Sequence, residues 1–163
     1  MSIKKVRSLF LALVLTLFVT MSIALPFAFA EDSWETKSPM PTGRHSFSAV
    51  EANGKIYAIG GAGTARSVEE YDPTTDTWSK KTDTPTEIIS CGVAEVNRKI
   101  YVIGRKNVHE YNPATNTWVT KADTTNREQF GVAEVNGKIY AIGGNNNGPL
   151  NTVEEYDPAT DTW

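Results

Sequence analysis

One unit recurs three times in this chain, and that repetition constrains the fold more than any single residue does. Residues 53–61 read N-G-K-I-Y-A-I-G-G, and residues 136–144 repeat this run without a change. Residues 68–78 and 153–163 share V-E-E-Y-D-P-x-T-D-T-W, and a looser copy of both runs lies at 97–104 and 108–118. Such repeats fold as units that bury their apolar surface against neighbouring units. The fold must therefore be an array of three similar modules.

The first thirty residues differ in character from the repeats. Lys4, Lys5 and Arg7 precede an apolar run that ends in Ala28-Phe29-Ala30. A basic start, an apolar centre and an A-x-A ending are typical of a secretory signal peptide. We therefore expect a signal helix over 1–30 and a secreted or cell-surface protein, with an uncleaved membrane anchor as the alternative. Residues 31–163 are expected to form the folded region.

The charge of that region argues against two classes of partner. No acidic and three basic residues precede position 31, which leaves 13 Lys and Arg against 19 Asp and Glu. Nucleic-acid binding depends on neutralising phosphates, and binding to anionic lipid depends on basic clusters. We expect neither nucleic-acid binding nor stable membrane insertion after cleavage.

Each repeat predicts four short strands, a to d, separated by turns. Strand a lies at 46–51, 92–96 and 131–135, and the Asn-Gly pairs at 53–54 and 136–137 are typical of tight hairpins. Arg98 replaces the glycine in repeat two, so we expect that hairpin to be the least regular. Strand b, K-I-Y-A-I-G, is apolar on both faces, which places it in a sheet covered on both sides. Strand c is V-E-E-Y, and strand d begins at the tryptophan.

The glycine pair Gly60-Gly61, then Tyr71 and Trp78, resembles the kelch repeat. The pattern returns as Gly143-Gly144 with Tyr156 and Trp163, whereas repeat two has Arg105 in place of the second glycine. The resemblance covers 34–163. It implies an all-β propeller in which each repeat is one four-stranded blade and the Tyr and Trp side chains pack between blades.

Blade boundaries follow from the tryptophan spacing. Trp34, Trp78, Trp118 and Trp163 stand 44, 40 and 45 residues apart, within the ~40–50 residue period of propeller blades. We predict blades at approximately 42–84, 85–123 and 124–163, with 33–41 as a leading d strand. Three blades are fewer than the ~4–8 of known propellers. The chain is therefore expected to be part of a longer propeller, or to complete a ring with other copies, or to be marginally stable.

The chain offers little support for catalysis or metal binding. His45 and His109 occupy different repeat positions, so they are not expected to share a metal, and we interpret them as a loop histidine and a solvated strand histidine. The D-P-x-T-D segments lack the ligand alternation of a calcium loop and are interpreted as turns. Cys91 aligns with Phe47 and Phe130 and is expected to fill an aromatic's place in the core. We predict no catalytic residues, no metal and no cofactor.

Binding is expected where the copies differ, in the b–c loops and the d–a loops. The resemblance implies that these loops gather at one end of the ring, and loops on a rigid scaffold commonly carry binding sites. Arginine and asparagine side chains there suit a carboxylate-bearing or sugar partner. Arg44 and Arg127 have a structural alternative, which is to bond loop carbonyls. The candidate ligand-binding residues are Arg44, Arg66, Arg105, Asn107, Arg127, Asn145, Asn146 and Asn147.

These observations support three hypotheses. The first is a non-catalytic secreted or cell-surface module that recognises a protein or glycan through its loops. The second is a fragment of an exported propeller enzyme, because the resemblance includes copper oxidases and sugar mutarotases. The third is a structural envelope protein that self-associates through open blade faces.

Overall fold

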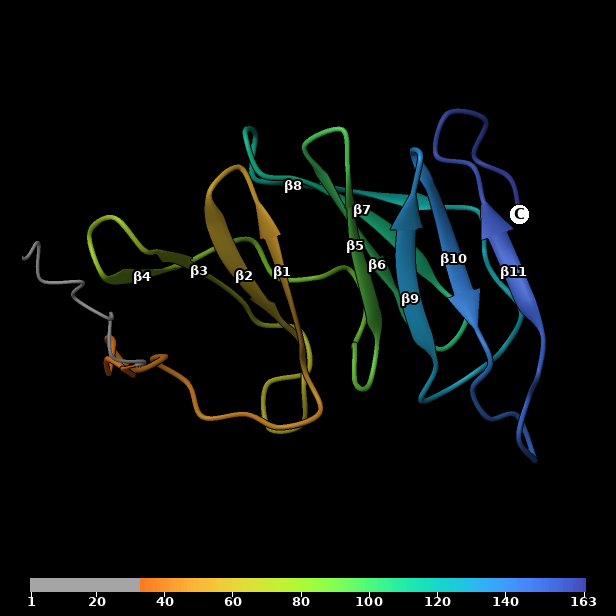
Figure 1. Cartoon of the computed structure of the whole chain (residues 1–163), viewed down its shortest axis with the longest axis horizontal. Coiled ribbons are helices and arrows are strands. Elements are labelled where there is room, and N and C mark those ends of the chain that lie inside the picture. Colours follow the sequence, from red (N-terminus) through yellow and green to blue (C-terminus); the bar gives the residue numbers. More distant parts are fainter. Residues whose placement is uncertain (1–32) are drawn as a thin grey trace, which may run out of the picture. The chain divides into compact units, whose positions relative to one another are not determined.

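The computed structural model describes residues 33–163, and the predicted signal peptide at 1–30 lies outside them. These residues form eleven strands in three antiparallel sheets, and they contain no helix that is long and apolar enough to cross a membrane. Each sheet is one blade, and the blades follow one another along the chain (Figure 1). The fold is an all-β partial propeller, as the sequence predicted.

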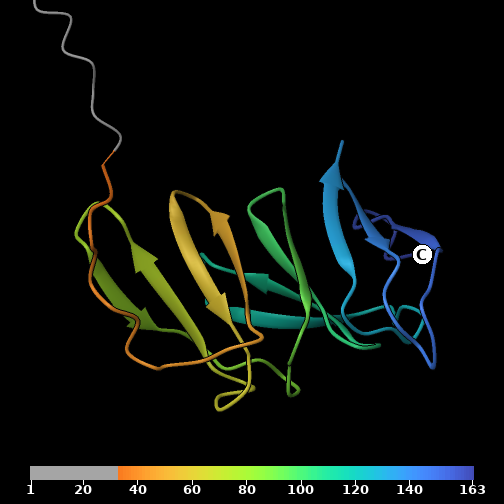
Figure 2. The ribbon, with the colours of Figure 1, turned by 60° about the horizontal axis from the view of Figure 1, so that its bottom comes forward.

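Within a blade, consecutive strands are hydrogen-bonded neighbours. Blade 1 comprises β1 (Ser48–Ala52), β2 (Lys55–Ile59), β3 (Val68–Asp72) and β4 (Thr77–Lys80). Blade 2 comprises β5 (Gly92–Val96), β6 (Lys99–Ile103), β7 (Val108–Asn112) and β8 (Thr117–Lys121). Blade 3 has three strands, β9 (Gly131–Val135), β10 (Lys138–Ile142) and β11 (Val153–Tyr156). Figure 2 shows the same succession of sheets from another side.

The core lies between blades, because strand b is apolar on both faces. One cluster joins Tyr57, Ile59 and Val68 of blade 1 to Ile100 and Tyr111 of blade 2. A second cluster joins the equivalent face of blade 2 to blade 3. Cys91 packs against the edge of the first cluster, as predicted, and burial raises the pKa of its thiol. Each blade is therefore stabilised mainly by its neighbours.

Each blade also forms two hydrogen bonds to the backbone of the chain segment that precedes it. Asp76 accepts a hydrogen bond from the Ser38 N–H at 2.9 Å, and the Trp78 indole donates to the Ser38 carbonyl at 2.9 Å. We call this pair of bonds the clasp. The clasp recurs at Thr82 with Asn116 and Trp118, and at Ala122 with Asp161 and Trp163.

The clasp explains the D-P-x-T-D-T-W segment. Asp72 accepts a hydrogen bond from the Thr74 N–H at 2.9 Å and so closes the turn, as predicted. Asp76 adopts a positive φ of 53° and also accepts a bond from the Tyr71 hydroxyl at 2.6 Å. That hydroxyl and the Ser38 N–H hold the pKa of Asp76 below its ordinary value. The segment is therefore a turn that places one carboxylate acceptor against the chain segment that precedes the blade.

Two strand predictions at the start of the folded region were wrong. Residues 33–41, expected as a leading d strand, form no strand: they pair with none of the eleven strands, and the segment is held at Ser38 by the clasp. Strand β1 begins at Ser48 rather than residue 46, since Ser46 has a φ of 53°. Ser90 and Gln129 adopt the same conformation before β5 and β9.

The expected irregularity of the second hairpin was also wrong. Asn97 and Arg98 have φ values of 51° and 64°, close to those of Asn53 and Gly54 at 55° and 75°. Val96 still pairs with Lys99, as Ala52 pairs with Lys55. The turn keeps its geometry, and Arg98 is held in a left-handed conformation that disfavours side chains.

Arg98→Gly is therefore expected to raise the free energy of unfolding by about 1 kcal/mol, because glycine adopts positive φ without steric cost. Urea denaturation of the two chains measures the difference. Arg98→Ala is the control, since alanine retains the Cβ and is expected to give no gain. An equal gain from both variants would assign the effect to the arginine side chain rather than to the backbone.

Candidate functional site

The b–c and d–a loops meet at one end of the blades, which we call the loop end. Backbone hydrogen bonds join the two loop classes. Ile88 donates to Ala65 at 2.7 Å, Arg127 donates to Arg105 at 2.8 Å, and Asn145 donates to Glu128 at 2.8 Å. The candidate binding residues therefore lie on one continuous set of loops.

Arg44 and Arg127 take the structural role rather than the ligand-binding role. The Arg44 side chain is buried, and its guanidinium donates to the carbonyls of Gly60 and Ser67, each at 2.9 Å. It also forms an ion pair with Glu69 at 2.9 Å. Arg127 is buried as well and bonds the Gly143 carbonyl at 3.0 Å. Both side chains fasten a b–c loop to its own sheet, so the hypothesis that they contact a ligand is corrected.

In blades 1 and 3 a threonine completes the buried pair. Thr42 donates to Glu69 at 2.7 Å, and Thr125 donates to Glu154, which pairs with Arg127. The pKa of Glu154 lies below its ordinary value because hydrogen bonds from Thr125 and Thr124 and the charge of Arg127 outweigh its burial. The Thr-x-Arg sequence and the glutamate thus form one unit that is present twice.

Blade 2 replaces the whole unit with an uncharged one. Ile88 stands at the arginine position and His109 at the glutamate position, and both are buried. Thr86 lies 2.9 Å from the His109 Nε2 atom, so the threonine contact is retained. Burial lowers the pKa of His109, while Asp123 opposes the effect. The interpretation of His109 as a solvated residue was wrong. The sequence holds a signal of this pair: when the repeats are aligned, the arginine position and the glutamate position both change in repeat two and in no other repeat.

The other predicted residues lie at or near the surface of the loop end. Arg66 donates to the Thr84 carbonyl at 2.8 Å, and the Asn107 carbonyl accepts from Gly104 at 2.9 Å. Asn145 accepts a bond from the Gly148 N–H at 3.1 Å. Asn146 and Asn147 are exposed. These residues shape the b–c loops, and their outward atoms remain accessible.

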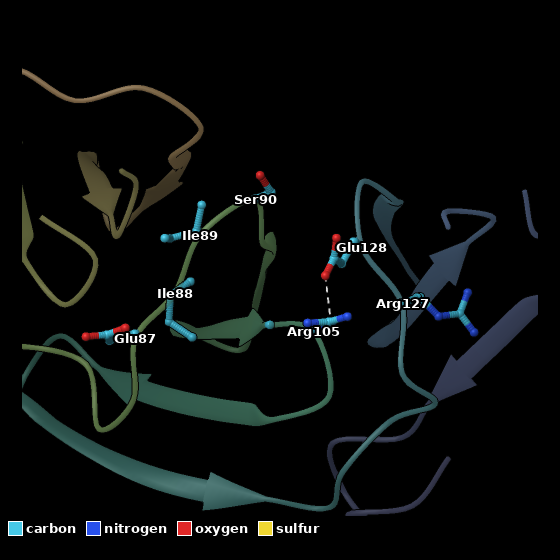
Figure 3. A pocket seen from close by; sticks show the side chains of 8 residues that line it. Glu87, Ile88, Ile89, Ser90, Arg105, Arg127 and Glu128 are labelled. Atoms are coloured by element: carbon cyan, nitrogen blue, oxygen red, sulfur yellow. Dashed lines mark ion pairs between the residues drawn. The ribbon is translucent and has the colours of Figure 1, made fainter. Parts of the chain in front are cut away.

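A hollow of about 300 Å³ opens at the loop end of blade 2. Its lining includes Ile88, Ile89 and the ion pair between Arg105 and Glu128, whose atoms approach to 2.8 Å. Figure 3 shows this pair on one side of the hollow, while the Arg127 guanidinium points away toward the third sheet. Ile89 is 51% exposed, and the Arg105 side chain is 67% exposed.

The hollow exists because repeat two departs from its neighbours. In blades 1 and 3, His45 and Glu128 form backbone bridges to Ala62 and Asn145 of longer b–c loops. Within residues 33–163, no such bridge forms at Ile89, where the b–c loop is only 104–107. Of the residues that line the hollow, the sequence predicted Arg105 and Arg127 but missed Ile89 and Glu128.

A second hollow of about 600 Å³ lies between the turns of blades 1 and 2, away from the loop end. Its lysines are engaged within the blades: Lys81 pairs with Glu70 at 3.1 Å, and Lys55 with Asp72 at 2.5 Å. Its walls consist largely of the repeated turn residues that serve as scaffold in each blade. The loop-end hollow is the better candidate despite its smaller volume, because Ile88, Ile89 and Arg105 in its lining depart from the residues at the equivalent positions of the other repeats.

No group of three or more His, Cys, Asp and Glu side chains in the described part of the chain lies close enough to hold a metal ion. His45 is an exposed loop residue and His109 is buried within blade 2. The loop-end hollow instead combines an exposed apolar side chain with an exposed ion pair. That combination suits recognition of a partner surface.

A comparison with protein families matches the model described as "Kelch motif" to residues 43–85 and 126–163. The two matched segments are the first and third repeats, and the departures at Ile88, Arg105 and His109 lie in the segment between them. No curated protein matches the chain.

Proposed function

The chain belongs to the kelch-repeat family, and on that premise we propose that it is an exported, non-catalytic module that binds a partner protein at the loop end of blade 2. Kelch repeats commonly serve as protein-binding scaffolds. The observation that carries the site assignment is the exposed Ile89 of blade 2, which lines the same hollow as the ion pair between Arg105 of blade 2 and Glu128 of the loop that leads into blade 3.

The chemistry of the hollow indicates what the partner presents. Ile89 offers an apolar contact, and burying such a side chain contributes to affinity in proportion to the area removed from water. Arg105 offers donors suited to a carboxylate, since arginine binds planar anions bidentately. A peptide segment with an apolar side chain next to Asp or Glu satisfies both groups. We favour this ligand over a glycan because exposed isoleucine gives a sugar no hydrogen bond.

Export is the second part of the proposal. It rests on the basic start, apolar run and A-x-A ending of residues 1–30, a pattern typical of secretory signals. The partner is then an extracellular or cell-surface protein. N-terminal sequencing of the chain recovered from outside an expressing cell tests this part by locating the cleavage.

Selection from a phage-displayed random peptide library tests the binding site. We expect the chain to enrich peptides that place Leu, Ile or Phe beside Asp or Glu. Ile89→Asp is expected to weaken binding of the selected peptides by roughly tenfold or more, because it removes the apolar contact and repels the carboxylate. Fluorescence anisotropy with a labelled peptide measures the change.

Arg98→Ala, in the hairpin turn at the other end of blade 2, is the matched control and is expected to leave peptide affinity unchanged. Peptides whose affinity is insensitive to Ile89→Asp would place the site elsewhere. Selective binding on a glycan array in the absence of any peptide enrichment would overturn the choice of a protein partner.

A further inference from the structure

The hollow of about 600 Å³ between the turns of blades 1 and 2 carries a local excess of positive charge. It lies where the β1–β2 turn meets the β5–β6 and β7–β8 turns, at the same end of the two sheets (Figure 1). One acidic side chain, Glu70, lines it. The basic side chains of its wall are Lys55, Lys81, Arg98 and Lys99. This balance is the reverse of that in the folded region as a whole, where acidic residues are in excess.

Two substitutions in repeat two contribute to the excess. Arg98 stands at a position where the other two repeats have glycine, and this change adds a positive charge. Asn112 stands where the other repeats have Asp72 and Asp157, and this change removes a negative charge. Arg98 and Asn112 both line the hollow. Its charge is therefore a property of repeat two and not of the scaffold that the repeats share.

The missing aspartate leaves Lys99 with a weaker partner than its counterparts have. In blade 1, Lys55 pairs with Asp72 at 2.5 Å, and blade 3 retains the same pair. In blade 2, Lys99 pairs instead with Glu110 at 3.5 Å, and Lys121 contacts the same carboxylate at 3.4 Å. The Lys99 side chain is 33% exposed. Its ammonium group is therefore available to a further anion.

Arg98 adopts a costly conformation without contributing a side-chain contact to the fold. Its φ is 64°, in the left-handed region. Its backbone N–H donates to the Glu95 carboxylate, but its guanidinium forms no hydrogen bond or ion pair within residues 33–163. Strained residues of this kind are concentrated at ligand-binding sites. An unengaged arginine in the wall of a hollow indicates that its guanidinium serves a ligand.

Glu70 does not cancel this charge, because both of its carboxylate oxygens are engaged within blade 1. One oxygen lies 3.1 Å from the Lys81 ammonium. The other accepts a hydrogen bond from the buried Tyr57 hydroxyl at 2.5 Å. The carboxylate is thus held against its own blade and away from Arg98 and Lys99, which belong to blade 2.

The rest of the wall suits the polar part of a small ligand. Asn53, Asn97 and Asn112 line the hollow, and asparagine amides both donate to and accept from hydroxyl groups. The Asn112 carbonyl oxygen already accepts from the Ala114 N–H at 3.1 Å, so its amide NH₂ is the group left for a ligand. The volume lies within the ~300–1,000 Å³ of typical small-molecule sites.

We propose that this hollow binds a sugar that carries a phosphate or sulfate ester. Arg98 and Lys99 bind the oxyanion, and the asparagine amides bind the hydroxyl groups of the sugar. Arginine suits such an anion because its N–H donors bind two oxygens at once, while lysine adds a point charge. The site lies at the opposite end of blade 2 from the loop end, so it does not depend on the proposed binding of a partner protein.

Nuclear magnetic resonance of the isotope-labelled full chain tests the site. The probes are glucose 6-phosphate, glucose 6-sulfate, inorganic phosphate and inorganic sulfate, titrated at constant ionic strength. We expect at least one ester to give saturable shifts in the amides of 53–55, 97–99 and 112–114, and to bind several-fold more tightly than its inorganic ion. The tighter of the two esters identifies the oxyanion.

Variants of the two substituted positions test the assignment of residues. Arg98→Gly is expected to weaken ester binding by about tenfold, although it relaxes the turn, so a loss cannot be attributed to unfolding. Asn112→Asp is expected to weaken binding as well, because it restores a carboxylate beside Lys99. Lys106→Ala, which removes one positive charge at the loop end, is the control and is expected to leave affinity unchanged.

Three results would each overturn the proposal. The first is that neither ester gives saturable shifts with the wild-type chain. The second is that the inorganic ions bind as tightly as the esters. The third is that Arg98→Gly retains the wild-type affinity, or that Lys106→Ala weakens binding as much as Arg98→Gly does.

Discussion

Glu69→Ala is expected to lower the free energy of unfolding by about 3–5 kcal/mol, the usual cost of removing one partner of a buried ion pair. The loss leaves the buried guanidinium of Arg44 without its counter-charge. It also removes the acceptor of the Thr42 hydroxyl. Small domains are stable by ~5–15 kcal/mol, so the change is large. Urea denaturation followed by tryptophan fluorescence measures it.

Blade 2 supplies the matched control for this prediction. The double variant Arg44→Ile with Glu69→His installs the uncharged pair found at Ile88 and His109. It is expected to be more stable than Glu69→Ala and Arg44→Ile singly, because no unpaired charge remains buried and Thr42 regains a partner. If the double variant loses as much free energy of unfolding as the two single variants combined, the uncharged pair of blade 2 cannot replace the charged pair of blade 1.

Trp118→Ala is expected to cost about 3 kcal/mol, at the lower end of the range for large aromatic truncations because the side chain is only partly buried. Trp118 packs against the cluster between blades 1 and 2, and its ring lies 4.7 Å from that of Tyr111. Its indole also donates to the Thr82 carbonyl at 3.0 Å, which is half of the clasp. The substitution therefore removes packing and a bond between blades. Thermal unfolding followed by circular dichroism measures the loss.

Two variants separate these contributions. Trp118→Phe keeps most of the packing and loses the indole N–H, so about 1 kcal/mol is expected, the net worth of one hydrogen bond. Val119→Ala changes an exposed neighbour on β8 and is expected to have little effect. A Trp118→Phe chain as unstable as Trp118→Ala would mean that the clasp, rather than packing, holds blade 2 to its neighbour.

Most of the fold was predictable because the sequence pattern of each strand and turn occurs three times in the chain. The K-I-Y-A-I-G run is apolar on both faces, and that pattern alone required sheets covered on both sides. Residues 33–41 show the limit of such reasoning. Ser38 follows Trp34 by four residues, as Thr82 follows Trp78 and Ala122 follows Trp118, and all three are clasped. A strand also needs a neighbour, and sequence similarity does not supply one.

The site was harder to predict, because charge alone does not say which way a side chain points. Arg44 and Arg127 looked like ligand-binding residues, and both guanidinium groups lie within their own blades. In the aligned repeats, Ile88 replaces the arginine and His109 replaces the glutamate in the same repeat. Such a joint replacement indicates that the two side chains contact each other. Ile89 carried the opposite signal: an apolar residue in a loop, in the repeat with the shortest b–c connection.

The two bonds of the clasp go to the N–H and the carbonyl of the residue that it holds, and that residue is serine, threonine or alanine in the three cases. Because both bonds go to backbone, the clasp forms with alanine at Ala122 as well as with Ser38 and Thr82. A newly duplicated repeat can therefore form the clasp with its neighbour before any mutation changes the held position, although its core side chains must still pack against that neighbour. Propellers built on this joint can change their number of blades by whole-unit duplication or deletion, while the loops diverge separately.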